Sequence, residues 1–103
     1  MDRTELRRSW DDVAAAYARN RDPDGSDADL LEDLLAELPA DPDVLDIGPC
    51  DGARTLDNLP AGSVGIDISR EALEMARERV PESALLEGDM AVLPIADESM
   101  DAV

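Results

Sequence analysis

Two glycines, Gly48 and Gly52, follow a short apolar run at residues 44–47 and could bring a backbone turn close to a ligand. The apolar run fits a buried parallel strand, and glycine lets the chain turn sharply where a side chain would collide. A helix is predicted to start after the turn, over residues 53–59. Its unpaired N-terminal amides would face the turn, so the spacing favours a site for a carboxylate or a phosphate.

An acidic residue, Asp67, ends a second predicted strand about 20 residues after Asp46, which is the spacing at which nucleotide-binding βαβ units hold ribose hydroxyls. A carboxylate suits that task because it can accept two hydrogen bonds from a vicinal diol. The alternative is a charged strand end that faces water. Asp46 itself lies inside an apolar strand, where a lone carboxylate is costly, so either a ligand-directed or a structural role is predicted for it.

Four segments of the chain, in this order, resemble the motifs of class I S-adenosylmethionine (SAM)-dependent methyltransferases. The likeness is greatest to the small-molecule branch that includes the quinone-biosynthesis C-methyltransferases. It covers residues 44–103 and, more faintly, the helical stretch before them. It implies methyl transfer from SAM to a small-molecule acceptor, achieved by in-line positioning of the two reactants. The segments are Asp46-x-Gly48-x-Cys50-x-Gly52, Gly65-Ile66-Asp67-Ile68-Ser69, Gly88-Asp89-Met90 and Leu93-Pro94-x-x-Asp97-x-Ser99-x-Asp101.

The resemblance also implies a set of cofactor-binding residues, with no catalytic acid or base among them. In this family an acid at the position of Asp67 binds both ribose hydroxyls, and an acid at the position of Asp46 orients the methionine end. Asp89 resembles the acid that accepts a hydrogen bond from the adenine amino group, with Met90 packed beside the ring; a plain loop aspartate is the alternative. The full predicted set is Asp46, Gly48, Pro49, Cys50, Gly52, Asp67, Ile68, Asp89 and Met90.

Cys50 departs from the family pattern, because it stands where the motif has its middle glycine. Its side chain could limit how closely the backbone approaches the methionine moiety. A buried thiol is expected rather than a reactive one, since no Lys or His lies nearby to activate it. Asp51 adds a negative charge beside the expected carboxylate site. Trp10 and Tyr17 are predicted to pack in the core, with Tyr17 as an alternative cover for the cofactor, as in the N-terminal helices of this branch.

The composition excludes several other kinds of site. The 103-residue chain has no His and one Cys, so no zinc or other metal site, Ser-His-Asp triad or intrachain disulfide is expected. A formal net charge of −17 without any Lys argues against nucleic acid as a partner. We interpret this acidity as adaptation to high salt, where cations screen the repulsion. No apolar leader or membrane-spanning run is visible, so a cytoplasmic protein is predicted.

Alternating strand and helix signals predict an α/β fold with a doubly wound, Rossmann-like parallel sheet. Two helices are predicted to come first, over residues 4–20 and 26–38, with Ser26 as the N-cap of the second after a break at 21–25. A third helix should begin after Ser69 and end near Val80. Strands are predicted at 44–47, 63–68 and 84–87, and the start of a fourth at 101–103.

These elements predict an N-terminal helical segment, residues 1–39, followed by the N-terminal half of a SAM-binding domain, residues 40–103. The sheet is expected to be incomplete, so that its first strand keeps an open edge and favours self-association. Two rival interpretations stay open. One is a non-catalytic fragment or remnant of a nucleotide-binding fold. The other is an NAD-dependent oxidoreductase, whose Gly-x-Gly-x-x-Gly fingerprint is matched poorly by glycines at positions 48 and 52.

Overall fold

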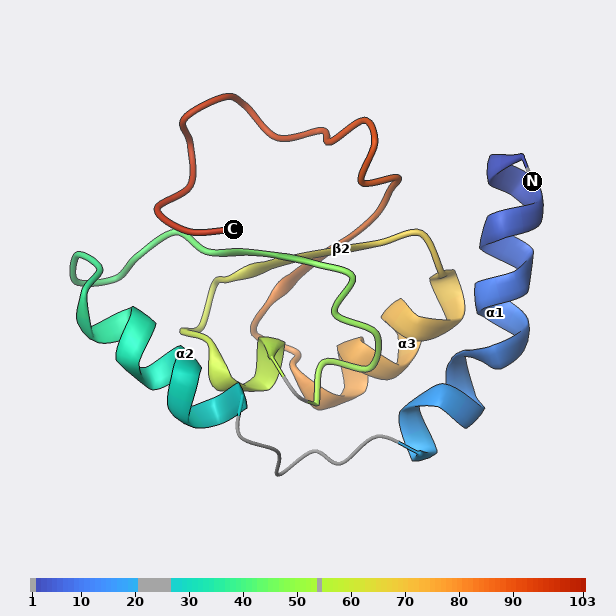
Figure 1. The fold of residues 1–103 in the computed structure, drawn as a ribbon, viewed down its shortest axis with the longest axis horizontal. Helices are drawn as coiled ribbons and strands as arrows, with labels where there is room; N and C mark the ends of the chain where they lie inside the picture. The colour runs from blue at the N-terminus through green and yellow to red at the C-terminus, as the bar shows by residue number, and fades with distance from the viewer. Residues whose placement is uncertain (1, 21–26, 54) are drawn as a thin grey trace.

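The computed structural model describes residues 2–20, 27–53 and 55–103, and it has the predicted α/β architecture (Figure 1). Two helices precede the first strand, and strands then alternate with helical segments. Ser26 and the break at 21–25 lie outside the described residues. The elements are α1 (Arg3–Arg19), α2 (Asp27–Ala36), β1 (Leu45–Ile47), the 3-10 helix η1 (Leu56–Asn58), β2 (Val64–Asp67), α3 (Arg70–Arg79) and β3 (Ala84–Glu87).

The three strands form one parallel sheet in the order β1-β2-β3. On the other side of β1, Val44 forms a parallel bridge with Ala102, and the amide of Leu45 donates to the Ala102 carbonyl at 3.0 Å. The chain after β3 reaches this place by arching away from the sheet and returning beside the start of β1 (Figure 1). The predicted strand alternation is thus confirmed, and the start of a fourth strand predicted at residues 101–103 is present as a single isolated bridge.

Helices α1 and α3 begin with side-chain caps. Asp2 caps α1, because its carboxylate accepts from the amide of Glu5 at 2.8 Å while the Glu5 carboxylate accepts from the amide of Asp2 at 3.2 Å. This capping box satisfies two amides that have no partner inside the helix. Ser69 caps α3 as predicted, since its hydroxyl accepts from the amide of Ala72 at 3.2 Å.

The helix predicted at residues 53–59 is wrong in extent. Among the described residues of this range, helical structure is limited to the 3-10 helix η1, in which the amides of Asn58 and Leu59 donate to the carbonyls of Thr55 and Leu56. The short helix ends with Leu59 as its C-cap, and the backbone of Leu59 is extended (ψ 161°), as is usual for a residue that precedes proline. This three-residue helix does not provide the anion site that the N-terminal amides of a longer α-helix would have formed at the turn.

Two small clusters of buried residues meet on α3, and the sheet region adds Val44, Leu45 and Ile66 to the core. Ala14, Cys50 and Ala72 form one cluster between α1 and α3, and Leu56, Ala76 and Val80 form the other beneath β2. α1 and α3 lie next to each other, whereas α2 lies at the opposite end of the sheet, beside η1 (Figure 1).

The prediction that Trp10 and Tyr17 pack in the core is wrong. They are 41% and 40% exposed and pack against each other edge to face, with ring centroids 5.7 Å apart. Ala14 is the one buried residue of α1 within the described chain. The apolar stripe of α1 therefore lies largely at the surface of the pocket described below.

Replacing Gly65 with alanine is expected to destabilise the fold by about 1–3 kcal/mol. A Cβ at this position would lie 3.0 Å from Pro49 Cγ and 3.1 Å from Leu56 Cδ2, and the proline ring cannot rotate away. Gly88→Ala is the matched control, since its Cβ would meet Ile66 Cγ2 at an ordinary 3.4 Å. Urea unfolding of the two variants measures the difference. Equal stabilities would contradict the packing argument.

Candidate cofactor-binding site

A pocket lies at the carboxyl ends of the strands, with α1 as one of its walls. The loops after β1, β2 and β3 supply one side, through residues such as Gly48, Asp67 and Asp89. α1 supplies the other side with Leu6, Trp10 and Tyr17, among others. Open parallel sheets bind ligands at this end, because the loops that follow the strands converge there.

Six of the nine predicted site residues line this pocket, namely Gly48, Cys50, Asp67, Ile68, Asp89 and Met90. Asp46, Pro49 and Gly52 do not. Their places in the fold are described below, and cofactor contact by these three stays a prediction.

Asp67 lies at the end of β2 and ties two loops together. Its Oδ2 accepts from the amide of Cys50 at 3.1 Å, and its Oδ1 accepts from the amide of Ser69 at 2.9 Å. A carboxylate has about four acceptor positions, so these two bonds leave capacity for two hydroxyls of a ligand. The two amides also hold the carboxylate in one orientation at the pocket wall.

Gly48 offers a place where a ligand can approach the backbone. Its φ is +76°, and no atom beyond its chain neighbours lies within 4 Å of the position that a Cβ would take. Gly48 is also one of the residues that line the pocket. A side chain there would be strained, because its φ lies in the left-handed region that favours glycine.

Cys50 adopts the backbone conformation that explains why glycine is usual at this position. Its φ is 55°, in the left-handed region that L-residues adopt at a cost. The Cys50 side chain is 8% exposed and packs with Ala14 and Ala72. The thiol is therefore buried, as predicted, and it joins the loop after β1 to the cluster between α1 and α3.

Gly52 and Pro49 pack against other parts of the fold and do not line the pocket. Gly52 has a φ of +81°, and a Cβ there would lie 3.3 Å from Cγ2 of Val80, the C-cap residue of α3. Pro49 is buried and lies against Gly65 on β2. Both residues shape the turn from behind, so they influence the position of Gly48 without lining the pocket.

Asp46 lines a different groove, beside the bridge between Val44 and Ala102. This groove is also lined by Leu31 and Leu34 of α2, by Thr55 and by Ala102. One carboxylate oxygen of Asp46, Oδ2, is buried.

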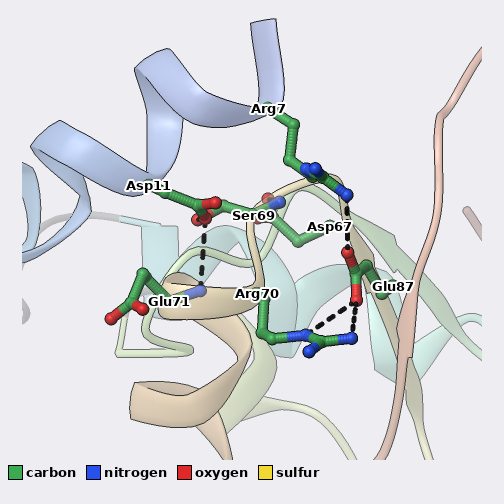
Figure 2. Close-up of polar contacts among 7 residues, drawn as sticks. All are labelled: Arg7, Asp11, Asp67, Ser69, Arg70, Glu71 and Glu87. Atoms are coloured by element: carbon green, nitrogen blue, oxygen red, sulfur yellow. Dashed lines mark hydrogen bonds and ion pairs between the residues drawn. The ribbon is translucent and has the colours of Figure 1, made fainter. Parts of the chain in front are cut away.

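α1 carries polar residues toward the pocket that sequence analysis did not identify. Arg3 Nε lies 2.9 Å from Asp89 Oδ2. Arg7 Nη1 lies 3.8 Å from Glu87 Oε1, and Figure 2 shows this pair. Asp11 reaches the start of α3. The spacing of four residues between Arg3, Arg7 and Asp11 places all three on one helix face, and this periodicity could have identified them.

The family model described as a methyltransferase domain matches residues 45–103, which is more than half of the chain. The chain belongs to this methyltransferase domain family. A search of curated proteins found no match.

The methyltransferase match begins at β1 and includes the pocket loops that contain Gly48, Asp67 and Asp89. α1 and α2 precede it. The family assignment therefore covers the strand side of the pocket, whereas the α1 side is known from this structure alone.

No helix among the described residues of the methyltransferase chain has the length and apolar character needed to cross a bilayer.

Proposed function

We propose that this chain binds SAM in the pocket at the carboxyl ends of β1, β2 and β3 and serves methyl transfer to a small-molecule acceptor. The observation that carries the proposal is Asp67. Its carboxylate lines the pocket at the end of β2, retains acceptor capacity and lies within the methyltransferase match. The four-motif resemblance further favours the small-molecule branch that includes the quinone-biosynthesis C-methyltransferases.

Each part of the cofactor has a candidate partner among the residues of the pocket. Asp67 would accept the two ribose hydroxyls. The open backbone at Gly48 would admit the methionine end, and Ile68 with Met90 would supply apolar contact for the adenine ring. Asp89 would accept from the adenine amino group, which requires it to share its carboxylate with Arg3 and with the amide of Ala91. Bound SAM would supply a methyl group activated by its sulfonium.

The protein's contribution to the reaction is positioning. We assign no catalytic acid or base, because transfer of an already activated methyl group needs donor and acceptor aligned and water excluded. Residues 40–103 form the cofactor-binding part in this proposal. Residues 1–39 form a helical segment that contributes one wall through α1.

The proposal predicts that the protein binds SAM and its demethylated product more tightly than NAD. The Gly-x-Gly-x-x-Gly turn that NAD enzymes use is absent, and the buried side chain of Cys50 stands between the two glycines. Calorimetry in molar KCl with each of the three ligands measures the order of affinity. Tighter binding of NAD than of SAM would overturn the proposal in favour of an oxidoreductase.

A further inference from the structure

Asp11, a residue of α1, accepts hydrogen bonds from the N-terminus of α3. Asp11 Oδ1 accepts a hydrogen bond from the Ser69 hydroxyl at 2.7 Å and another from the amide of Glu71 at 3.3 Å (Figure 2). The Ser69 hydroxyl in turn accepts from the amide of Ala72, so it both donates and accepts. Ser69 is only 1% exposed. A carboxylate at a helix N-terminus is favoured by the helix dipole as well as by these hydrogen bonds.

This cap connects α1 to the proposed ribose-binding carboxylate. The amide of Ser69 donates to Asp67 Oδ1, and Asp67 Oδ2 accepts from the amide of Cys50. A continuous chain of hydrogen bonds therefore runs from Asp11 through Ser69 and Asp67 to the loop after β1. Displacing Asp11 would free the Ser69 hydroxyl and loosen the strand-to-helix turn that orients Asp67.

The Asp11 contacts differ in kind from two ion pairs that α1 also makes. Among its described residues only Ala14 is buried. The side chains of the Arg3–Asp89 and Arg7–Glu87 pairs remain partly in contact with solvent, so salt screens both pairs. The Asp11 contacts are direct hydrogen bonds to a buried hydroxyl and a helix amide, which are short-range and less sensitive to screening.

We propose that Asp11 is a positioning residue for cofactor binding, a role that rests on the proposed function. It docks α1 on the N-terminus of α3, which keeps Leu6, Trp10 and Tyr17 at the pocket wall and steadies the turn that bears Asp67. Asp11 does not line the pocket, so its effect on a ligand is transmitted through Ser69 and α1.

The test compares Asp11→Ala with Asp12→Ala in the full chain at molar KCl. Both changes remove one carboxylate from α1, but Asp12 is exposed. Trp10 is the only tryptophan in the sequence, so its fluorescence reports the state of α1 without any added ligand. We expect Asp11→Ala to shift Trp10 emission to longer wavelength, increase acrylamide quenching and weaken SAM binding about tenfold. Asp12→Ala should match the wild type in all three measurements.

Asp11→Asn keeps an acceptor oxygen without the charge, so it should recover most of the affinity. If Asp11→Ala loses its helical circular dichroism, Asp11→Asn against Asp12→Asn becomes the deciding pair, with about a threefold loss expected from the weaker neutral bonds. Identical Trp10 signals in the Asp11 and Asp12 variants would overturn the docking role. An altered Trp10 signal with unchanged SAM affinity would overturn the positioning role. Failure of the wild type to bind SAM would instead refute the proposed function and with it the positioning role, while the Trp10 comparison would still decide the docking.

Discussion

Asp67→Ala is expected to abolish measurable SAM binding, with a loss of affinity of at least about a hundredfold. Two charge-assisted hydrogen bonds to the ribose would disappear, at about 1.5–3 kcal/mol each. The fold should also lose stability, because the amides of Cys50 and Ser69 would lose their acceptor. The sequence alone suggests a loss of binding with an intact fold, and these two bonds revise that expectation.

Two variants separate the binding effect from the folding effect. Asp67→Asn keeps one acceptor oxygen and nearly the same volume, so we expect it to retain more stability than Asp67→Ala while still losing affinity. Asp97→Ala removes an exposed carboxylate elsewhere and, in 2 M KCl, where charge repulsion is screened, should leave both quantities unchanged. Calorimetry gives the affinity and urea unfolding gives the stability. Wild-type affinity in a folded Asp67→Ala protein would show that the ribose binds elsewhere.

Raising KCl from 50 mM to 2 M is expected to stabilise the fold strongly. The net charge of −17 is confined to a chain with a radius of gyration of 13.6 Å. The Debye length falls from roughly 10 Å at 0.1 M to 3 Å at 1 M, so salt removes most of the self-repulsion. Salt also weakens the Arg3–Asp89, Arg7–Glu87 and Arg70–Glu87 pairs. Partly exposed pairs contribute only about 0–1 kcal/mol each, so screening of the repulsion should dominate.

Thermal unfolding followed by circular dichroism, repeated across the KCl series, measures this effect. A variant with Asp12→Asn and Asp97→Asn provides the control, because it removes two exposed negative charges. It should unfold at a higher temperature than the wild type at 50 mM KCl and at the same temperature at 2 M. An unfolding temperature that is independent of KCl would contradict both the repulsion argument and the proposed adaptation to high salt.

Much of the architecture was predictable from local patterns. The strand at 84–87 has the predicted bounds, and Ser69 caps α3 as predicted. Both features depend on residues close together in sequence. The strand follows from a short apolar run between Pro81 and Gly88, and the cap follows from a hydroxyl three residues before the amide that it accepts from. The spacing of Asp46, Gly48 and Asp67 likewise predicted which strand ends meet, because parallel strands carry their following loops to one edge of the sheet.

The tertiary structure decided which glycine of the turn lines the pocket and which one packs against the fold. Gly48 and Gly52 have the same residue type and similar positive φ angles, but open space surrounds Gly48 whereas α3 lies against Gly52. α3 begins well beyond Gly52 in the chain, so no local pattern distinguishes the two glycines. The contact between Asp11 and Ser69 joins residues still farther apart. Such contacts form only when the sheet brings β2 and α3 beside α1, because sequence periodicity specifies which face a residue occupies but not what that face will meet.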